Sequence, residues 1–136
     1  MELSIPKIVL QILHIFTALC LLLDFCCDCY YLSDAPPWKI RTGVDPKIRS
    51  GNMFFYMNIS ILAWLILSFL IAVVEICLLF EVKWFEQFGT GIIKPIVILL
   101  MGIAHLGVCG DLGLASGILT LFAGVAWLII AILLMV

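Results

Sequence analysis

The chain has 136 residues, of which 65% are hydrophobic and 12% are charged, and its formal net charge at pH 7 is −2. Soluble domains average about 45–50% apolar and about 25% charged residues, so this composition predicts an integral membrane protein without a separate soluble domain. The negative net charge excludes a nucleic-acid-binding protein, because no basic surface is available to neutralise phosphates.

Four apolar runs, each of about 20 residues or more, are long enough to cross the hydrocarbon core of a bilayer. They cover roughly residues 8–31, 53–80, 91–109 and 113–136. The sequence therefore predicts one domain, residues 1–136, that is an all-α bundle of four transmembrane helices with short loops. An even number of spans places both ends of the chain on one side of the membrane. We expect the first run to be a retained span, because no small-residue cleavage site follows it.

The first run carries a stripe of polar residues. An ionisable group within a membrane span costs several kcal/mol and normally faces protein or water. On a helix with about 3.6 residues per turn, one narrow face carries His14, Thr17, Asp24 and Asp28. This face is therefore expected to point into the bundle.

The end of the first run, with the sequence DFCCDC, holds three of the six cysteines. Together with a fourth cysteine on the same side of the membrane, the candidate acylation or disulfide residues are Cys26, Cys27, Cys29 and Cys109. They are inert, or acylated if that side is cytosolic, or joined in a disulfide if it is luminal. The C-x-x-C spacing also suits a thiol oxidoreductase, but such membrane enzymes use a second cysteine pair, which is lacking here. No metal site is predicted, because adjacent cysteines on different helix faces would have to converge.

Depth in the membrane predicts two polar clusters, one of Asp24, Asp28, His105 and Asn58, and one of Glu75 with His14 or Lys94. Ser68 shares a face with Glu75 and is expected to extend a thin polar track into the bundle. The leading interpretation is that these groups form satisfied interhelical pairs that fix the register of the helices. Two alternatives remain: the carboxylates reach headgroup water, or they mark a proton or cation path. The candidate residues for such a path are Asp24, Asp28, His105 and Glu75.

Small residues are concentrated in the second half of the chain. Gly113 and Gly117 form a GxxxG motif, and Gly124 lies one heptad further on the same face. Such faces let helix backbones approach closely in a membrane. Gly102 and Gly107 in the third run offer matching positions. The prediction is close packing of the third and fourth runs as a hairpin, with a dimer face as the alternative.

An acidic residue late in the second run (AVVEICLLFE) is followed by an aromatic stretch (KWFEQFGTG), a glycine-bearing third run (ILLMGIAHLG) and a glycine-rich fourth run (LGLASGILTLFAGVAWLII). From Phe54 to Val136 this pattern resembles small eukaryotic four-span proteins of the Golgi and vesicles, the COPI-associated and late-Golgi vesicle membrane proteins, with the Flower proteins as distant relatives. The resemblance implies cytosolic termini, endomembrane residence and no enzymatic role. It also implies a luminal cysteine cluster, which favours a disulfide over acylation. The Flower-like relationship implies a calcium-channel role for Glu75.

These observations predict a non-catalytic protein that serves as an accessory subunit, or as a trafficking-associated component, of a membrane complex. The resemblance implies Golgi or vesicle membranes, and another organelle membrane is the alternative. The expected partners are the lipid bilayer and either other membrane-protein subunits or further copies of this chain. No enzyme activity or cofactor is expected, since the sequence has no phosphate-binding loop, zinc-protease motif or nucleophile elbow. The alternatives are a cation or proton channel and, third, a membrane thiol oxidoreductase.

Overall fold

The computed structural model describes residues 5–33, 51–89, 91–106 and 110–135; for Ser33 and residues 51–58 it describes the backbone only. The elements in chain order are α1 (Lys7–Ser33), α2 (Gly51–Leu79), the short 3-10 helix η3 (Lys83–Phe88), α3 (Ile93–His105) and α4 (Asp111–Met135). The described residues contain no strand, and the predicted all-α class is confirmed.

Three helices are long and apolar enough to cross a membrane. Their candidate spans are Lys7–Leu32 in α1, Ile59–Leu79 in α2 and Asp111–Met135 in α4. Each of these spans lies over one of the runs predicted from the sequence. The chain is therefore an integral multi-pass membrane protein.

The third apolar run forms a shorter helix than the predicted span 91–109. With 13 residues and a rise of about 1.5 Å per residue, α3 is about 20 Å long, whereas a bilayer core is about 30 Å thick. Pro95 explains where the helix begins, because proline lacks an N–H and is accommodated in the first turn of a helix. Residues 107–109 of the predicted span, including Cys109, lie outside the described residues.

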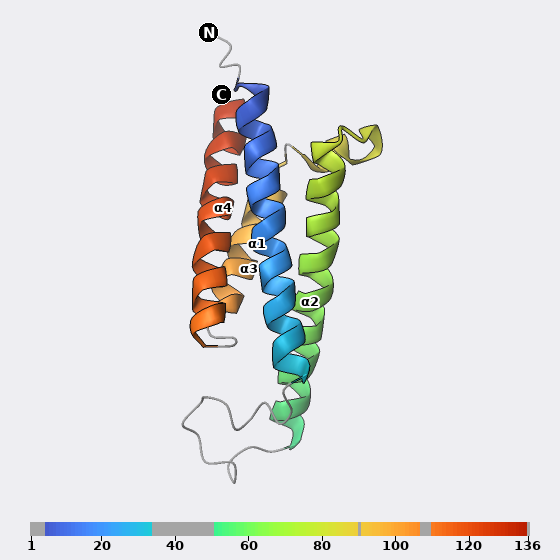
Figure 1. Ribbon diagram of the computed structural model, residues 1–136, viewed down its shortest axis with the longest axis vertical. Helices are drawn as coiled ribbons and strands as arrows, with labels where there is room; N and C mark the ends of the chain where they lie inside the picture. Colours follow the sequence, from blue (N-terminus) through green and yellow to red (C-terminus); the bar gives the residue numbers. More distant parts are fainter. Residues whose placement is uncertain (1–4, 34–50, 90, 107–109, 136) are drawn as a thin grey trace.

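The helices form two antiparallel hairpins that pack side by side (Figure 1). Helix α1 packs against both α2 and α4, whereas α3 packs mainly against α4. The first turn of α1, the last turn of α4 and η3 lie at the same end of the bundle. The backbones of α2 and α3 are consequently not packed closely against each other.

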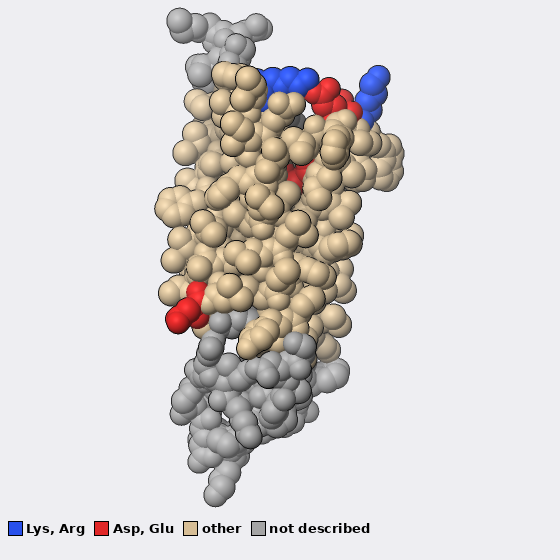
Figure 2. Space-filling view, in the orientation of Figure 1, with Lys and Arg blue, Asp and Glu red and all other residues tan. Residues whose placement is uncertain are grey.

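The outer surface of the bundle is apolar, and several polar side chains are buried among apolar ones inside it. The buried polar side chains are Thr17, Asp24, Asp28, Ser68, Glu75, His105, Ser116 and Thr120. Large apolar side chains face outward, for example Ile12 with 61% and Phe122 with 66% of its surface exposed. On the face shown in Figure 2, few acidic or basic side chains appear between the two ends of the described bundle. Polar side chains that face the bundle interior beneath an apolar surface suit a bilayer, because polar groups within a membrane span normally face protein or water.

Glycines set the distance between α3 and α4. A Cβ atom added at Gly117 would lie 2.8 Å from the carbonyl oxygen of Gly102, and one added at Gly102 would lie 2.9 Å from the backbone nitrogen of Leu121. Gly113 and Gly124 are also buried, and a Cβ at Gly124 would lie 2.8 Å from the Leu99 side chain. The predicted packing of the third and fourth runs within one chain is thus present, with backbone touching backbone.

Candidate functional site

Two clusters of buried polar side chains lie inside the bundle. The first, here called the aspartate cluster, consists of Asp24, Asp28, His105, Ser116 and Thr120. His105 Nε2 lies 3.1 Å and 3.0 Å from the two carboxylate oxygens of Asp28. Asp24 accepts hydrogen bonds from Ser116 Oγ at 2.6 Å and from Thr120 Oγ1 at 2.7 Å. The cluster therefore joins α1 to both α3 and α4.

The hydrogen bonds of His105 define where protons are held in this cluster. Its Nδ1 atom lies 2.8 Å from the carbonyl oxygen of Met101. A carbonyl oxygen only accepts, so Nδ1 must carry a hydrogen. The contact between Nε2 and Asp28 then needs one further hydrogen, held either by the ring or by the carboxyl group. His105 and Asp28 therefore share a single proton between them. Each of the two side chains is only 1% exposed.

The second cluster, here called the glutamate cluster, consists of Thr17, His14, Glu75, Lys94 and Trp127. Glu75 Oε2 lies 2.5 Å from His14 Nδ1, and Glu75 Oε1 lies 2.7 Å from Lys94 Nζ. The Lys94 ammonium also sits 3.3 Å from the centre of the Trp127 ring. Trp127 Nε1 donates to Thr17 Oγ1 at 2.8 Å. This cluster therefore joins α1, α2, α3 and α4.

An apolar layer separates the two clusters. Leu21, Met101 and Ala123 have no exposed surface, and each lies between residues of the two clusters on its own helix. The layer contains side chains from α1, α3 and α4 and no polar side-chain atom except the thioether of Met101. Among the described residues, no hydrogen bond or ion pair joins one cluster to the other.

The structure brings together the ionisable pairs expected from helix depth. Asp28 meets His105, and Glu75 contacts both His14 and Lys94, where the sequence left a choice between these two.

Two other expectations concern the second apolar run. The Asn58 side chain, predicted to join the aspartate cluster, lies outside the described side chains. Ser68 is buried, but its hydroxyl donates to the carbonyl of Leu65 in its own helix at 3.0 Å. That hydrogen bond serves α2 itself and does not extend the polar track towards either cluster.

The cysteines at the end of α1 differ in exposure. Cys26 and Cys29 are exposed free thiols, and they are not joined to each other. Cys27 is fully buried, with its Sγ atom 3.7 Å from Ser116 Oγ. The fourth candidate, Cys109, lies outside the described residues. Modification of α1 at the membrane boundary would therefore meet Cys26 and Cys29 first.

Sequence reasoning missed the partners that α4 supplies. Ser116 and Thr120 are one helical turn apart and share the face that carries the packing glycines, and this spacing was a usable signal. Trp127 lies two turns further along the same helix. The glycines of α4 predict packing against α3, and this pattern alone does not pair the α4 hydroxyl groups with the carboxylates of α1.

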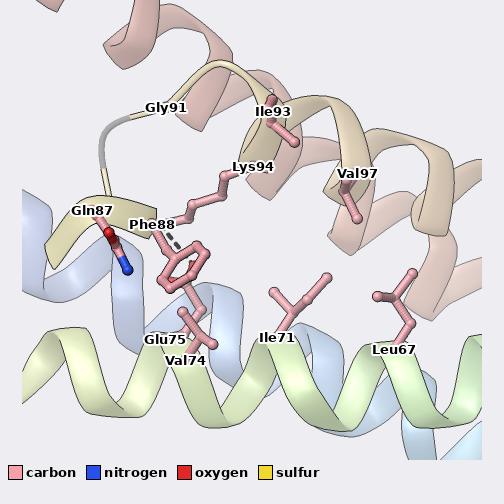
Figure 3. Close-up of a pocket in the computed structure, with 10 residues that line it drawn as sticks. All are labelled: Leu67, Ile71, Val74, Glu75, Gln87, Phe88, Gly91, Ile93, Lys94 and Val97. Atoms are coloured by element: carbon pink, nitrogen blue, oxygen red, sulfur yellow. Dashed lines mark ion pairs between the residues drawn. The ribbon is translucent and has the colours of Figure 1, made fainter. Parts of the chain in front are cut away.

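A cavity of about 570 Å³ lies between α2, η3 and α3, beside the glutamate cluster (Figure 3). Leu67, Ile71 and Val97 form apolar walls, while Glu75 and Lys94 meet across it. In the part of the chain that the structure describes, no three His, Cys, Asp or Glu side chains are grouped as metal ligands.

Comparison with protein-family models, with curated proteins and with solved structures finds no significant match to this chain.

Proposed function

We propose that the protein is a non-catalytic, structural membrane protein that acts as an accessory subunit, or as a trafficking-associated component, of a membrane complex. The two polar clusters then serve to fix the helices in register and to give the bundle a defined outer surface. Partners would contact that surface laterally, within the bilayer.

One observation carries this proposal: the buried ionisable groups compensate each other within the chain. Glu75 is in contact with His14 and Lys94, and neither cluster leaves a carboxylate without a hydrogen bond or ion pair. Compensated groups of this kind stabilise interhelical contacts. Between the two clusters, each of α1, α3 and α4 also carries a buried apolar side chain (Leu21, Met101 and Ala123), which disfavours transport.

The proposal includes α3 as the fourth membrane element. Lys94 near its start and His105 at its end both reach side chains of other helices within the bundle. Its close contact with α4 supports the same assignment. Residence in Golgi or vesicle membranes, with both termini in the cytosol, is part of the proposal and rests on the sequence resemblance.

Native mass spectrometry of the protein, released gently from its own membranes, tests this function. We expect a stoichiometric complex with at least one different membrane protein. A monomer or homo-oligomer without a foreign subunit would contradict the accessory role. Added acyl mass on the chain would indicate that Cys26 and Cys29 face the cytosol, contrary to the topology proposed above.

A proton pathway is the second candidate, and the shared proton between His105 and Asp28 favours it. In this case the purified chain in liposomes would conduct protons, and Glu75→Gln would abolish the flux while leaving the fold intact. An unchanged flux in that variant, or no flux in the natural protein, would exclude the pathway. The structural proposal predicts no flux above that of empty liposomes.

A further inference from the structure

We propose that the cavity between α2, η3 and α3 binds one uncharged lipid that carries a hydroxyl group. The hydroxyl would contact Glu75 and Lys94, and the hydrocarbon chain would lie between Leu67, Ile71 and Val97 (Figure 3). This inference does not depend on the accessory role proposed above.

The cavity results from how the helices pack. Helix α2 is held by α1 and α3 is held by α4, so α2 and α3 face each other without close backbone contact. The side chain of Lys94 crosses this gap to reach Glu75. At about 570 Å³, the space falls within the range of about 300–1,000 Å³ that small-molecule sites occupy.

The position of the cavity in the bundle indicates a lipid as its occupant. Its walls belong to membrane-embedded helices, so the molecules that reach it come from the bilayer. Glu75 lies one turn before the end of α2, and Trp84 and Phe85 of the adjoining η3 suit the membrane surface. Polar atoms therefore lie near the headgroup level, and the apolar walls extend towards the bilayer centre.

Two buried atoms at the cavity have unused hydrogen-bonding capacity. The side chains of Glu75 and Lys94 are 0% and 8% exposed, and they form a close ion pair. This contact uses only one of the three ammonium donors and one acceptor site of the carboxylate oxygen, and neither Lys94 Nζ nor Glu75 Oε1 has a further hydrogen-bond partner among the described groups. Buried polar atoms of this kind normally have a partner. A hydroxyl group satisfies both, because it donates to the carboxylate and accepts from the ammonium.

Charge selects an uncharged headgroup over an ionised one. Lys94 and Glu75 already neutralise each other, so a carboxylate or phosphate would bring an uncompensated charge into a site of low dielectric constant. Gln87, which also lines the cavity, adds a neutral donor and acceptor. The apolar lining by Val74 and Ile93 suits a single hydrocarbon chain.

Photocrosslinking in proteoliposomes tests the proposal with the full chain. The probe is a monoacylglycerol with a diazirine in its acyl chain, and the matched probe is the fatty acid with the same chain. We expect the monoacylglycerol to label α2 and α3 around Ile71 and Val97. The fatty acid should label these positions about tenfold less, because its carboxylate brings an uncompensated charge into the site and cannot donate to Glu75. Equal labelling by the two probes would overturn the proposal, and so would labelling spread evenly over the outer surface.

A matched pair of variants separates the cavity from the general lipid surface. Val74→Trp fills the cavity, whereas Val73→Trp makes the same change at a neighbouring exposed position that does not line it. Only Val74→Trp should abolish labelling by the monoacylglycerol; loss in both variants, or in neither, would contradict the assignment. Should Val74→Trp fail to fold, unlabelled monoacylglycerol must suppress labelling of the natural chain, and failure to compete would equally overturn it.

Discussion

His105 Nε2 in α3 lies 3.0 Å from Asp28 Oδ2 in α1, although the backbone of α3 packs mainly on α4. The contact between Glu75 and Lys94 likewise joins α2 to α3, another pair without close backbone packing. The buried charges thus add polar contacts between helices whose backbones do not pack closely, beside the apolar side-chain packing that α1, α2 and α3 share. Their removal should loosen the bundle between its two hairpins.

Removal of the Lys94 ammonium should destabilise the protein. Lys94→Met leaves Glu75 with His14 as its remaining ionisable partner, and we expect the free energy of unfolding to fall by about 2 kcal/mol. Denaturant titration of the protein in mixed micelles measures this change. Lys83→Met is the matched control, because Lys83 is exposed on η3. Equal effects of the two substitutions would show that the buried ion pair contributes nothing.

Close packing of α3 on α4 should not tolerate a side chain at Gly117. Gly117→Ala places its Cβ 2.8 Å from the carbonyl oxygen of Gly102, so the helices must separate. We expect a loss of about 1–3 kcal/mol, as for other overpacked sites. In Gly91→Ala the same methyl group meets no atom within 4 Å, and stability should change little. The two unfolding curves would coincide if the helix contact were less close than described.

The hydroxyl groups of α4 should stabilise the carboxylate of Asp24. Ser116→Ala removes the hydroxyl that donates to Asp24 Oδ1 and leaves this buried oxygen without that hydrogen bond. We expect the free energy of unfolding to fall by about 1–3 kcal/mol. Ser60→Ala, at an exposed position of α2, provides the comparison and should be close to neutral. A neutral Ser116→Ala in the same unfolding assay would mean that Asp24 finds another partner.

Much of this arrangement could be predicted from the sequence. Apolar run length located α1, α2 and α4, and depth along the spans paired Asp28 with His105. The length of α3 could not be obtained in this way, because hydropathy does not show where a helix begins near Pro95. The roles of Ser116 and Thr120 were not predicted either: their spacing places them on the glycine-bearing face of α4, but it does not show that this face also meets α1.

The thiols at the end of α1 should differ in reactivity. Cys26 and Cys29 are exposed, whereas Cys20 and Cys27 are buried. A thiol-reactive maleimide added to the protein in detergent should therefore label the first two much faster, since reaction needs access to the sulfur. Peptide mass spectrometry after short labelling times identifies the sites. Rapid labelling of Cys27 would show that α1 is rotated relative to α4.

A double-mutant cycle on Asp28 and His105 tests the structural role of the buried charges most directly. The unfolding free energies of Asp28→Ala, His105→Ala and the double variant are compared with that of the natural chain. We predict a coupling energy of about 1–2 kcal/mol. Either single substitution already removes the contact between the two side chains, so the double variant should be less destabilised than the sum of the single variants. A coupling within about 0.3–0.5 kcal/mol of zero is what independent sites give. That result would contradict the claim that this pair ties α3 to α1.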